Sequence, residues 1–291
     1  MASVRVGVLC SRGLKEIVII GAGRIGGALA AASPLPCTLV TRDSFYHVDG
    51  AGHVDGTAHV DHVDHVDHVW ERLRGPPGDP LLVCVRNDDL AAVVERVPMM
   101  RHSDLVFVQN GMIDGWLAAH GLADSTRGVL FFAVAKRGGP IEPGGVSPFT
   151  GPHAPALADW LLSFGVPAEA VDRRQFAAVM LEKLIWNAAF GLLCERYSVT
   201  VGEVLERHAQ ELTRVTAELN AVGRAALGVN LEDPPLLARL RDFAARIPDN
   251  RAGVKEWAWR GGWFVAAAHE HGLTLSTHDR LLAGLPRRPT G

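Results

Sequence analysis

The sequence predicts an α/β fold: a Rossmann-type doubly wound parallel sheet followed by an all-α C-terminal domain. A glycine-rich turn near residue 20 joins a β-branched run to an alanine-rich helical segment. Strand and helix patterns then alternate to about residue 150, as in parallel sheets with crossover helices. Beyond that point apolar residues mostly recur at helical spacing. We therefore expect an N-terminal extension at 1–14, a dinucleotide-binding domain at 15–152 and a helical substrate or dimerisation domain at 153–291.

The composition argues against several classes of protein. The chain has 291 residues, 48% of them hydrophobic, and a net charge of −3 at pH 7. Because it lacks a long basic run, nucleic acid is not expected as a partner. No charge-free apolar stretch reaches the roughly 18 residues that suggest a membrane span, so no membrane is expected either. The composition leaves a globular protein with a sizeable core.

The cysteines and the N-terminus bear on location. Cys10, Cys37, Cys84 and Cys194 lie far apart and form no CxxC motif, which predicts reduced thiols in an intracellular protein. Residues 1–15 contain three basic residues and no acid, a composition that fits a short organelle-targeting segment weakly. We expect a cytoplasmic protein, and an organelle is the alternative if these residues belong to a targeting segment.

The glycine-rich turn has the spacing of a dinucleotide-binding loop. The run Ile17–Ile20 leads into Gly-Ala-Gly-Arg-Ile-Gly, and a helical pattern follows. In such a loop the first glycine permits a tight turn, the second lets the backbone approach a pyrophosphate, and the third lets helix and strand pack closely. The helix N-terminus offers amides to the phosphates. The expected cofactor-binding residues here are Gly21, Gly23, Arg24, Ile25 and Gly26. The alternative is a glycine-rich turn without a ligand.

The end of the next strand indicates which cofactor is bound. The strand pattern Cys37–Asp43 ends in Thr41, Arg42 and Asp43. In this fold that end faces the adenosine ribose, where an acid favours NAD and an arginine accommodates the 2′-phosphate of NADP. We expect NADPH, with Arg42 as the phosphate partner. The alternative is that Arg42 is solvated and Asp43 holds the ribose.

A His-Val-Asp repeat at 47–69 separates this strand from the later strand patterns at Pro80–Asp88, Asp104–Gly111 and GVLFFAVAKRGG. A period of three suits neither a helix nor a strand, and such connections usually take far fewer residues. We interpret the segment as a repeat expansion in a tolerant loop and expect no metal site. Replacing it with a short Gly/Ser linker should leave the fold nearly unchanged. The alternatives are metal binding, since His and Asp are metal-ligand types, and a partner or regulatory segment.

Helical patterns dominate the second half, at 153–165, 173–197, 200–228 and 256–272. In the second of them, Lys183 and Asn187 lie one turn apart on an otherwise apolar segment. Burying an ammonium group without a function is costly, and a lysine in the expected interdomain cleft can act as general acid toward a carbonyl oxygen. An ordinary lysine pKa of about 10.4 would keep it protonated at neutral pH. The alternative is that Lys183 extends to solvent and pairs with Glu182.

Four segments resemble ketopantoate reductases (2-dehydropantoate 2-reductases). They are GAGRIG, VQNGM, EKLIWNAAF and DNRAGVKEWAWRGGWFVAAAHEHGL, in matching order between Lys15 and Leu285. The resemblance implies NADPH-dependent reduction of a small-molecule 2-oxo acid, a step of pantothenate biosynthesis if the substrate is 2-dehydropantoate, and a homodimer through the helical domain. It implies that Lys183 is the general acid and Glu256 its catalytic support. Asn110 would help hold the nicotinamide and substrate, and Asn187 would bind a substrate oxygen.

The chain also departs from the pattern of these reductases. Gly191 stands where a second asparagine is usual, and Ala244 and Ala245 replace a serine pair. Arg86 replaces a lysine near the cofactor, which keeps the charge but changes the geometry. The substrate is therefore open: 2-dehydropantoate, another 2-oxo acid, an imine or a bulkier apolar molecule. The last fits the tryptophans expected near the site, unless these pack in the core: Trp186, Trp257, Trp259 and Trp263.

A non-catalytic NADP(H)-binding protein of the same fold is the second hypothesis. Retention of Lys183, Asn110 and Glu256 together argues against it, because a decayed site need not keep all three.

Overall fold

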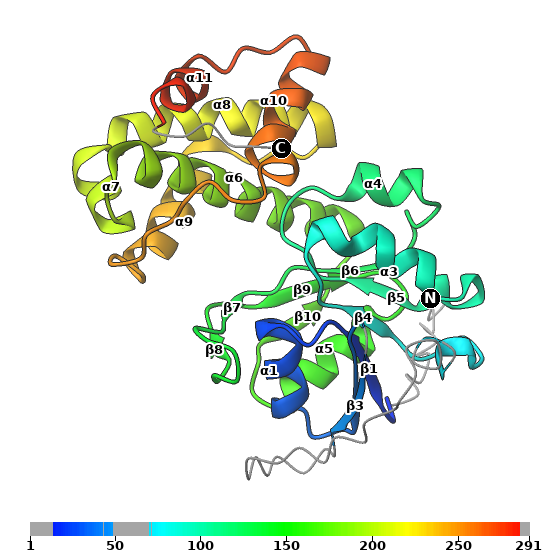
Figure 1. Ribbon diagram of the computed structural model, residues 1–291. Coiled ribbons are helices and arrows are strands. Elements are labelled where there is room, and N and C mark those ends of the chain that lie inside the picture. The colour runs from blue at the N-terminus through cyan, green and yellow to red at the C-terminus, as the bar shows by residue number, and fades with distance from the viewer. Residues whose placement is uncertain (1–13, 43, 49–69, 71, 286–291) are drawn as a thin grey trace, which may run out of the picture. The chain divides into compact units, whose positions relative to one another are not determined.

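The computed structural model describes residues 14–42, 44–48, 70 and 72–285 (Figure 1). The chain forms two compact units. The first comprises the residues up to Gln109 together with Leu122–Asp172, and the second comprises Asn110–Gly121 together with the residues from Arg173 onward. Residues 1–13 and most of the His-Val-Asp repeat, 49–69, lie outside the described residues.

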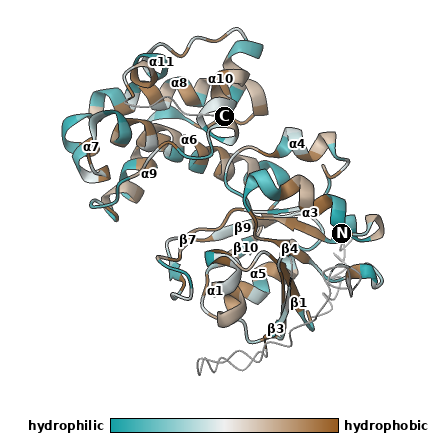
Figure 2. Ribbon diagram, in the orientation of Figure 1, coloured by the Kyte–Doolittle hydropathy of each residue, from teal (hydrophilic) through white to brown (hydrophobic). Residues whose placement is uncertain are grey.

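The first unit is built on a sheet that has eight strands in the described part of the chain, in the order β10-β9-β6-β5-β4-β1-β2-β3. The bounds are β1 Ile17–Ile20, β2 Cys37–Val40, β3 Phe45–Val48, β4 Leu81–Val83, β5 Leu105–Phe107, β6 Thr126–Gly128, β9 Ser147–Thr150 and β10 Ala168–Ala170. The central strands β2, β1, β4, β5 and β6 are parallel, as the predicted fold class requires. Their residues are mostly apolar, as Figure 2 shows, and most of them are buried. The strand expected in GVLFFAVAKRGG is misplaced, because only Gly128 of that segment belongs to β6. A separate ribbon pairs β7 (Phe132–Ala133) with β8 (Glu142–Pro143).

Antiparallel strands flank the parallel core on both sides. The edge strand β3 pairs antiparallel with β2, with Val48 opposite Cys37. His47 and Val48 were expected at the start of the repeat loop. They are instead the last two residues of β3, because their backbone pairs with strand β2. At the other edge β9 is antiparallel to β6, and β10 continues parallel to β9.

The helices of the first unit are α1 (Arg24–Ala32), α3 (Leu90–Arg96) and α5 (Ala154–Ser163). Helix α5, expected in the helical domain, packs against β9 and β10. Its buried Leu157, Trp160 and Leu161 join the core cluster of β1 and β2. The first unit accordingly extends to Asp172, beyond the expected boundary at residue 152, because the chain returns to the sheet as β10 before it leaves.

The second unit is helical in its described part. Its helices are α4 (Asp114–Ala119), α6 (Arg173–Tyr197), α7 (Val201–Arg207), α8 (Ala209–Leu227), α9 (Asp233–Ala245), α10 (Gly261–Glu270) and α11 (Ser276–Ala283). The segment 200–228, expected as one helix, is broken at His208, whose ring stacks on Tyr197. Helices α9 and α11 had no predicted counterpart.

Helix α6 forms the centre of this unit and contacts α7, α8, α9 and α11. It has the bounds expected from the sequence, because apolar residues recur at helical spacing over 25 positions that contain no proline. It is long and apolar enough to cross a membrane, yet most of it is buried within the unit, as expected of a core helix. Gly223 of α8 lets the side chain of Leu181 pack directly against the helix backbone.

Candidate functional site

The glycine-rich turn of the first unit has three glycines with different surroundings. Gly21 adopts a φ of +112°, and a Cβ added there would lie 2.9 Å from the carbonyl carbon and oxygen of Cys84. A Cβ at Gly26 would overlap the carbonyl oxygen of Gly21. Gly23, by contrast, has nothing within 4 Å of an added Cβ. The turn is therefore tight at its first and last glycines and open at the middle one, as a pyrophosphate approaching the backbone requires.

Helix α1 starts at this turn. Its N-cap residue Gly23 is extended and offers no side-chain cap, and the first turn carries no acidic residue. Arg24 is exposed, and Ile25 packs against the core cluster. Uncapped amides at a helix N-terminus bind phosphate through their N–H groups and the helix dipole. The residues of this turn thus fit the pyrophosphate of a dinucleotide.

Arginines lie around the turn and the strand ends beside it. The Arg42 side chain, which follows β2, is 73% exposed and pairs with Asp89 at 3.8 Å. Arg86 follows β4 and is exposed. Arg137, which no motif pointed to, donates to the carbonyl of Ala22 at 3.0 Å. These groups give the first unit cationic side chains for the phosphates of a cofactor. Asp43, the alternative ribose partner, lies outside the described residues.

The turn after β5 brings Asn110 into the second unit. Gln109 anchors the strand end by donating to the carbonyls of Val83 at 2.8 Å and Val85 at 3.2 Å. Asn110 is exposed, and the next residue, Gly111, has a φ of +92°. A Cβ at Gly111 would lie 2.6 Å from the carbonyl oxygen of Trp259, so this turn packs directly on that backbone.

Helix α6 carries Lys183 and Asn187 one turn apart, both half-buried. Burial, and to a lesser degree the positive charge of Arg260, together lower the pKa of Lys183 to about 7. The expectation of an ordinary lysine pKa near 10.4 is therefore wrong. Glu182, the alternative partner considered for Lys183, accepts from Nε of Arg239 at its Oε1 (3.1 Å) and from Nη2 of Arg239 at its Oε2 (2.7 Å).

Glu256 lies in a strained turn that also positions Arg260. Its φ of +48° and ψ of +51° are left-handed, a conformation that costs a non-glycine residue about 1–2 kcal/mol. The carbonyl of Glu256 accepts hydrogen bonds from the amides of Trp259 and Arg260 at 3.0 and 3.1 Å. Its carboxylate is paired with the guanidinium of Arg260. Glu256 thus lies beside the guanidinium whose charge acts on Lys183. Arg260 is part of a segment quoted for the resemblance but was not predicted as a site residue.

The structure shows the surroundings of Gly191, Ala244 and Ala245, the positions where the chain departs from the reductase pattern on the substrate side. A Cβ at Gly191 would lie 2.7 Å from the carbonyl oxygen of Gly253, so the chain segment at 253–254 occupies the space of a side chain there. Glu195, one turn later on α6, holds this segment by accepting from the amide of Val254 at 2.7 Å. Ala244 is fully buried and Ala245 is exposed. Neither offers a hydroxyl group to a substrate.

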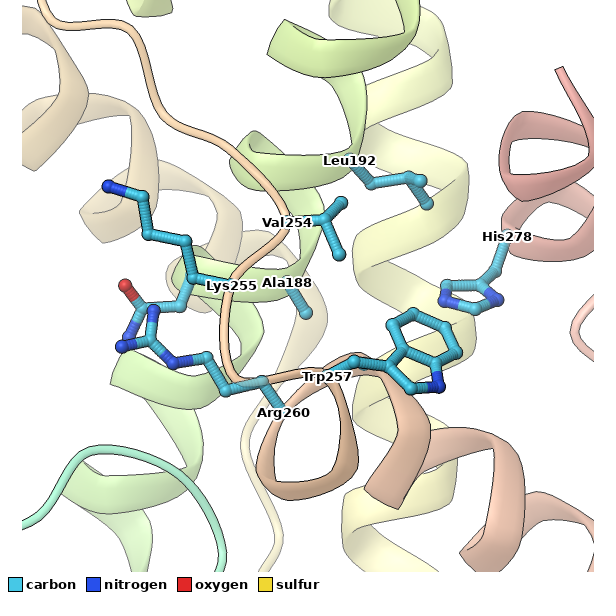
Figure 3. Close-up of a pocket in the computed structure, with 9 residues that line it drawn as sticks. Ala188, Leu192, Val254, Lys255, Trp257, Arg260 and His278 are labelled. Carbon is cyan, nitrogen blue, oxygen red and sulfur yellow. The ribbon is translucent and has the colours of Figure 1, made fainter. Parts of the chain in front are cut away.

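A small cavity lies beside this segment (Figure 3). Its lining residues are Asn187, Ala188, Leu192, Val254, Lys255, Trp257, Arg260, Gly261 and His278. Space of this size holds about one water molecule. Figure 3 shows that Arg260 and Trp257 extend to opposite sides of the same turn. The cavity is a recess beside Arg260 and too small for a whole substrate.

The tryptophans have packing partners within the second unit. Trp186 stacks on Phe190, with ring centroids 5.0 Å apart. Trp257 covers the glycine pair 261–262, where any added Cβ would meet its indole ring. Trp259 packs on the turn at Gly111, and Trp263 meets Phe264 edge to face. Each ring therefore has a packing partner, but all four tryptophans are half-buried and none belongs to the buried core.

No protein-family model and no curated protein matches the sequence. Solved structures do match. A ketopantoate reductase from Ralstonia eutropha JMP134 is 21% identical with a TM-score of 0.66, over 91% of this chain and 95% of that chain. The dimeric ketopantoate reductase from Staphylococcus aureus is 17% identical with a TM-score of 0.69, over 91% and 96%. D-mandelate dehydrogenase with NADH is 14% identical with a TM-score of 0.67, over 93% and 97%.

These matches confirm the resemblance at the level of the fold. A mostly parallel sheet with helices, followed by a helical region, is the arrangement that this chain shares with ketopantoate reductases. A second structure of D-mandelate dehydrogenase contains NADH and anilino(oxo)acetate, a molecule with a carboxylate beside a carbonyl group.

Proposed function

We propose that this chain is an NAD(P)H-dependent reductase of 2-oxo acids, with NADPH as its preferred cofactor. The observation that carries the proposal is Lys183: a half-buried amine whose pKa is lowered to about 7, one turn from Asn187. A buried, perturbed amine is costly unless it has a function. The glycine-rich turn of the first unit supports the cofactor half of the proposal, since its backbone fits a pyrophosphate.

A bound nicotinamide cofactor supplies the hydride in this chemistry. As the carbonyl carbon accepts it, negative charge builds on the carbonyl oxygen, and the protonated amine of Lys183 donates a proton there. A pKa near the working pH makes a lysine effective as a general acid. Asn187 donates a hydrogen bond to a substrate oxygen, Asn110 helps hold the nicotinamide and substrate, and Glu256 supports the lysine through Arg260.

Arg42 is the basis for preferring NADPH. Its guanidinium is exposed and only weakly paired, so it is available to the 2′-phosphate of the adenosine ribose. Arg86 and Arg24 would add positive charge at neighbouring strand and helix ends. We further propose that the enzyme is a homodimer through its helical unit, as the fold shared with the dimeric Staphylococcus aureus enzyme suggests.

The substrate is tested by following NADPH oxidation with a panel of carbonyl compounds. The panel holds 2-dehydropantoate, phenylglyoxylate and pyruvate, together with their neutral esters and a cyclic imine. We expect 2-oxo acids to be reduced faster than the other classes, with 2-dehydropantoate as the first candidate. Faster reduction of the imine than of the 2-oxo acids would instead indicate an imine reductase. NADPH binding without turnover of any compound would make it a non-catalytic nucleotide-binding protein.

A further inference from the structure

Arg260 lies where its charge does not help the helix that follows it. It is the N-cap residue of α10, and the N-terminus of a helix favours negative charge. Its backbone amide is held by the carbonyls of Glu256 and Trp257, each at 3.1 Å. Its side chain is only 14% exposed. A largely buried cation at this end of a helix is destabilising, so neither α10 nor solvation explains its presence.

The guanidinium has one edge without a partner. One terminal nitrogen, Nη2, donates to Glu256, whereas Nε is buried and has no hydrogen-bond partner within the described part of the chain. A buried donor without an acceptor destabilises a protein, unless a ligand supplies the acceptor. The Nε–H of an arginine and a neighbouring Nη–H bind a carboxylate through two parallel hydrogen bonds.

The surroundings of this edge also favour an anion. The charge of Arg260 reaches Lys183 on α6 strongly enough to lower the pKa of that amine. Arg260 and Asn187 line the same small cavity. A negatively charged group bound at Arg260 would therefore be attracted by two cationic side chains and lie near an amide donor.

We propose that Arg260 is a specificity-determining residue that binds the carboxylate of the substrate and thereby sets the neighbouring carbonyl oxygen before Lys183. The inference rests on the proposed reductase function and deepens it by naming the residue that selects a 2-oxo acid over a carbonyl compound without a carboxylate. Glu256 is the partner that holds the guanidinium when substrate is absent. The incoming carboxylate takes the Nε edge, so the arginine is already oriented when the substrate arrives.

The central experiment compares Arg260→Gln with the wild-type enzyme on two substrates, a reducible 2-oxo acid and its methyl ester. We expect the variant to raise KM for the acid by about 10- to 100-fold, the range of a lost charge-assisted hydrogen bond, and to leave KM for the ester nearly unchanged. Arg251→Gln is the matched control. Arg251 is an exposed arginine on the same connection, and its side chain donates to the carbonyl of Ser198 at 3.2 Å.

Two further measurements separate substrate binding from a structural role. Millimolar guanidinium should restore part of the acid activity of Arg260→Ala, which a merely packing arginine would not allow. The alkaline limb of the pH profile should move to higher pH in Arg260→Gln, because Lys183 no longer senses the guanidinium charge. If Arg260→Gln does not fold, Arg260→Lys replaces it. Lysine keeps the charge but cannot form two parallel hydrogen bonds to a carboxylate, so KM should still rise for the acid and not for the ester, by a smaller factor.

Equal effects on acid and ester, or no effect on either, would overturn the inference while leaving the reductase function intact. The proposed function can also fail by itself, if the wild-type enzyme reduces no carbonyl compound. Binding of oxamate, an unreactive carboxylate, is then followed by tryptophan fluorescence with NADPH present. Binding that is lost in Arg260→Gln supports the carboxylate site without turnover, whereas binding unchanged by the substitution, or absent in the wild type, overturns it.

Discussion

The glycine-rich turn of the first unit and the Lys183 region of the second unit are built by different means. The turn depends on backbone: three glycines decide where the chain bends, where it stays open and where helix and strand touch. The Lys183 region depends on charged side chains from separate segments, with Lys183 on α6 and Glu256 and Arg260 on the turn before α10. Under the proposed function, the first region would recognise its cofactor mainly through backbone shape, and the second would act on its substrate mainly through charge.

The largest expected effect is that of Lys183→Ala, which should separate the two regions cleanly. A proton donor acts only as the transition state forms, so its loss should lower kcat by about 10²- to 10⁴-fold. NADPH affinity, measured by fluorescence titration, should change little. Lys136→Ala, the same substitution at an exposed position of the first unit, is the control. Turnover of Lys183→Ala at the wild-type rate would remove the main support for the reductase proposal.

The pH dependence of the reduction tests the charge of the second region. A lysine whose pKa is lowered from 10.5 to about 7 is protonated below that pH and neutral above it. Donor-dependent reduction should therefore fall as the pH rises through 7, by about tenfold per unit beyond it. Oxidation in the reverse direction needs the neutral amine and should rise over the same range. A reduction rate that stays flat to pH 9 would show that Lys183 titrates as an ordinary lysine.

His278 near this region titrates in a different range. Burial lowers the pKa of His278, which lines the same cavity, so its titration belongs to a more acidic range than the limb assigned to Lys183. Glu256 is paired with Arg260, and Glu182 is paired with Arg239. The limb near pH 7 should be lost in Lys183→Ala and persist in His278→Gln.

The difference between the two regions also explains what the sequence could predict. The glycine spacing after Ile17–Ile20 is local, so the strand, turn and helix α1 follow from adjacent residues. Likewise the bounds of α6 follow from one uninterrupted apolar pattern. The proposed role of Arg260 could not be predicted from the sequence. It depends on a turn with left-handed Glu256, which lies 73 residues further along the chain than Lys183.

The same distinction accounts for the missed strands. Edge strand β3 begins at Phe45 and ends inside the His-Val-Asp repeat, where a compositional pattern hides the pairing with β2. Strand β10 has only three residues, two of them exposed, and is recognisable only by its partner β9. Both depend on neighbours distant in sequence rather than on their own periodicity.

Arg42→Ala tests whether the first region recognises the charge of the cofactor's 2′-phosphate in addition to the shape of its pyrophosphate. Loss of a charge-assisted contact to the 2′-phosphate should weaken NADPH binding by about 1.5–3 kcal/mol, or roughly 10- to 150-fold. NADH lacks that phosphate and serves as the internal control, with little change expected. Titration of both cofactors measures the difference. Equal weakening would show that Arg42 does not read the phosphate and that NADPH preference has another source.

The smallest effect is expected from alanine substitutions at two adjacent glycines of α1. The pair tests the contribution of backbone shape alone. A Cβ at Gly26 would overlap the carbonyl of Gly21, whereas a Cβ at Gly27 has nothing within 4 Å. Gly26→Ala should therefore lower the free energy of unfolding by about 1–3 kcal/mol through overpacking, and should weaken NADPH binding because the turn shifts. Gly27→Ala should raise it by up to about 1 kcal/mol, since alanine favours a helix over glycine. Denaturant unfolding and cofactor titration measure both. Similar free energies of unfolding and NADPH affinities in the two variants would contradict this expectation. They would mean that the turn tolerates a displaced Gly21 and that cofactor binding does not depend on this backbone shape.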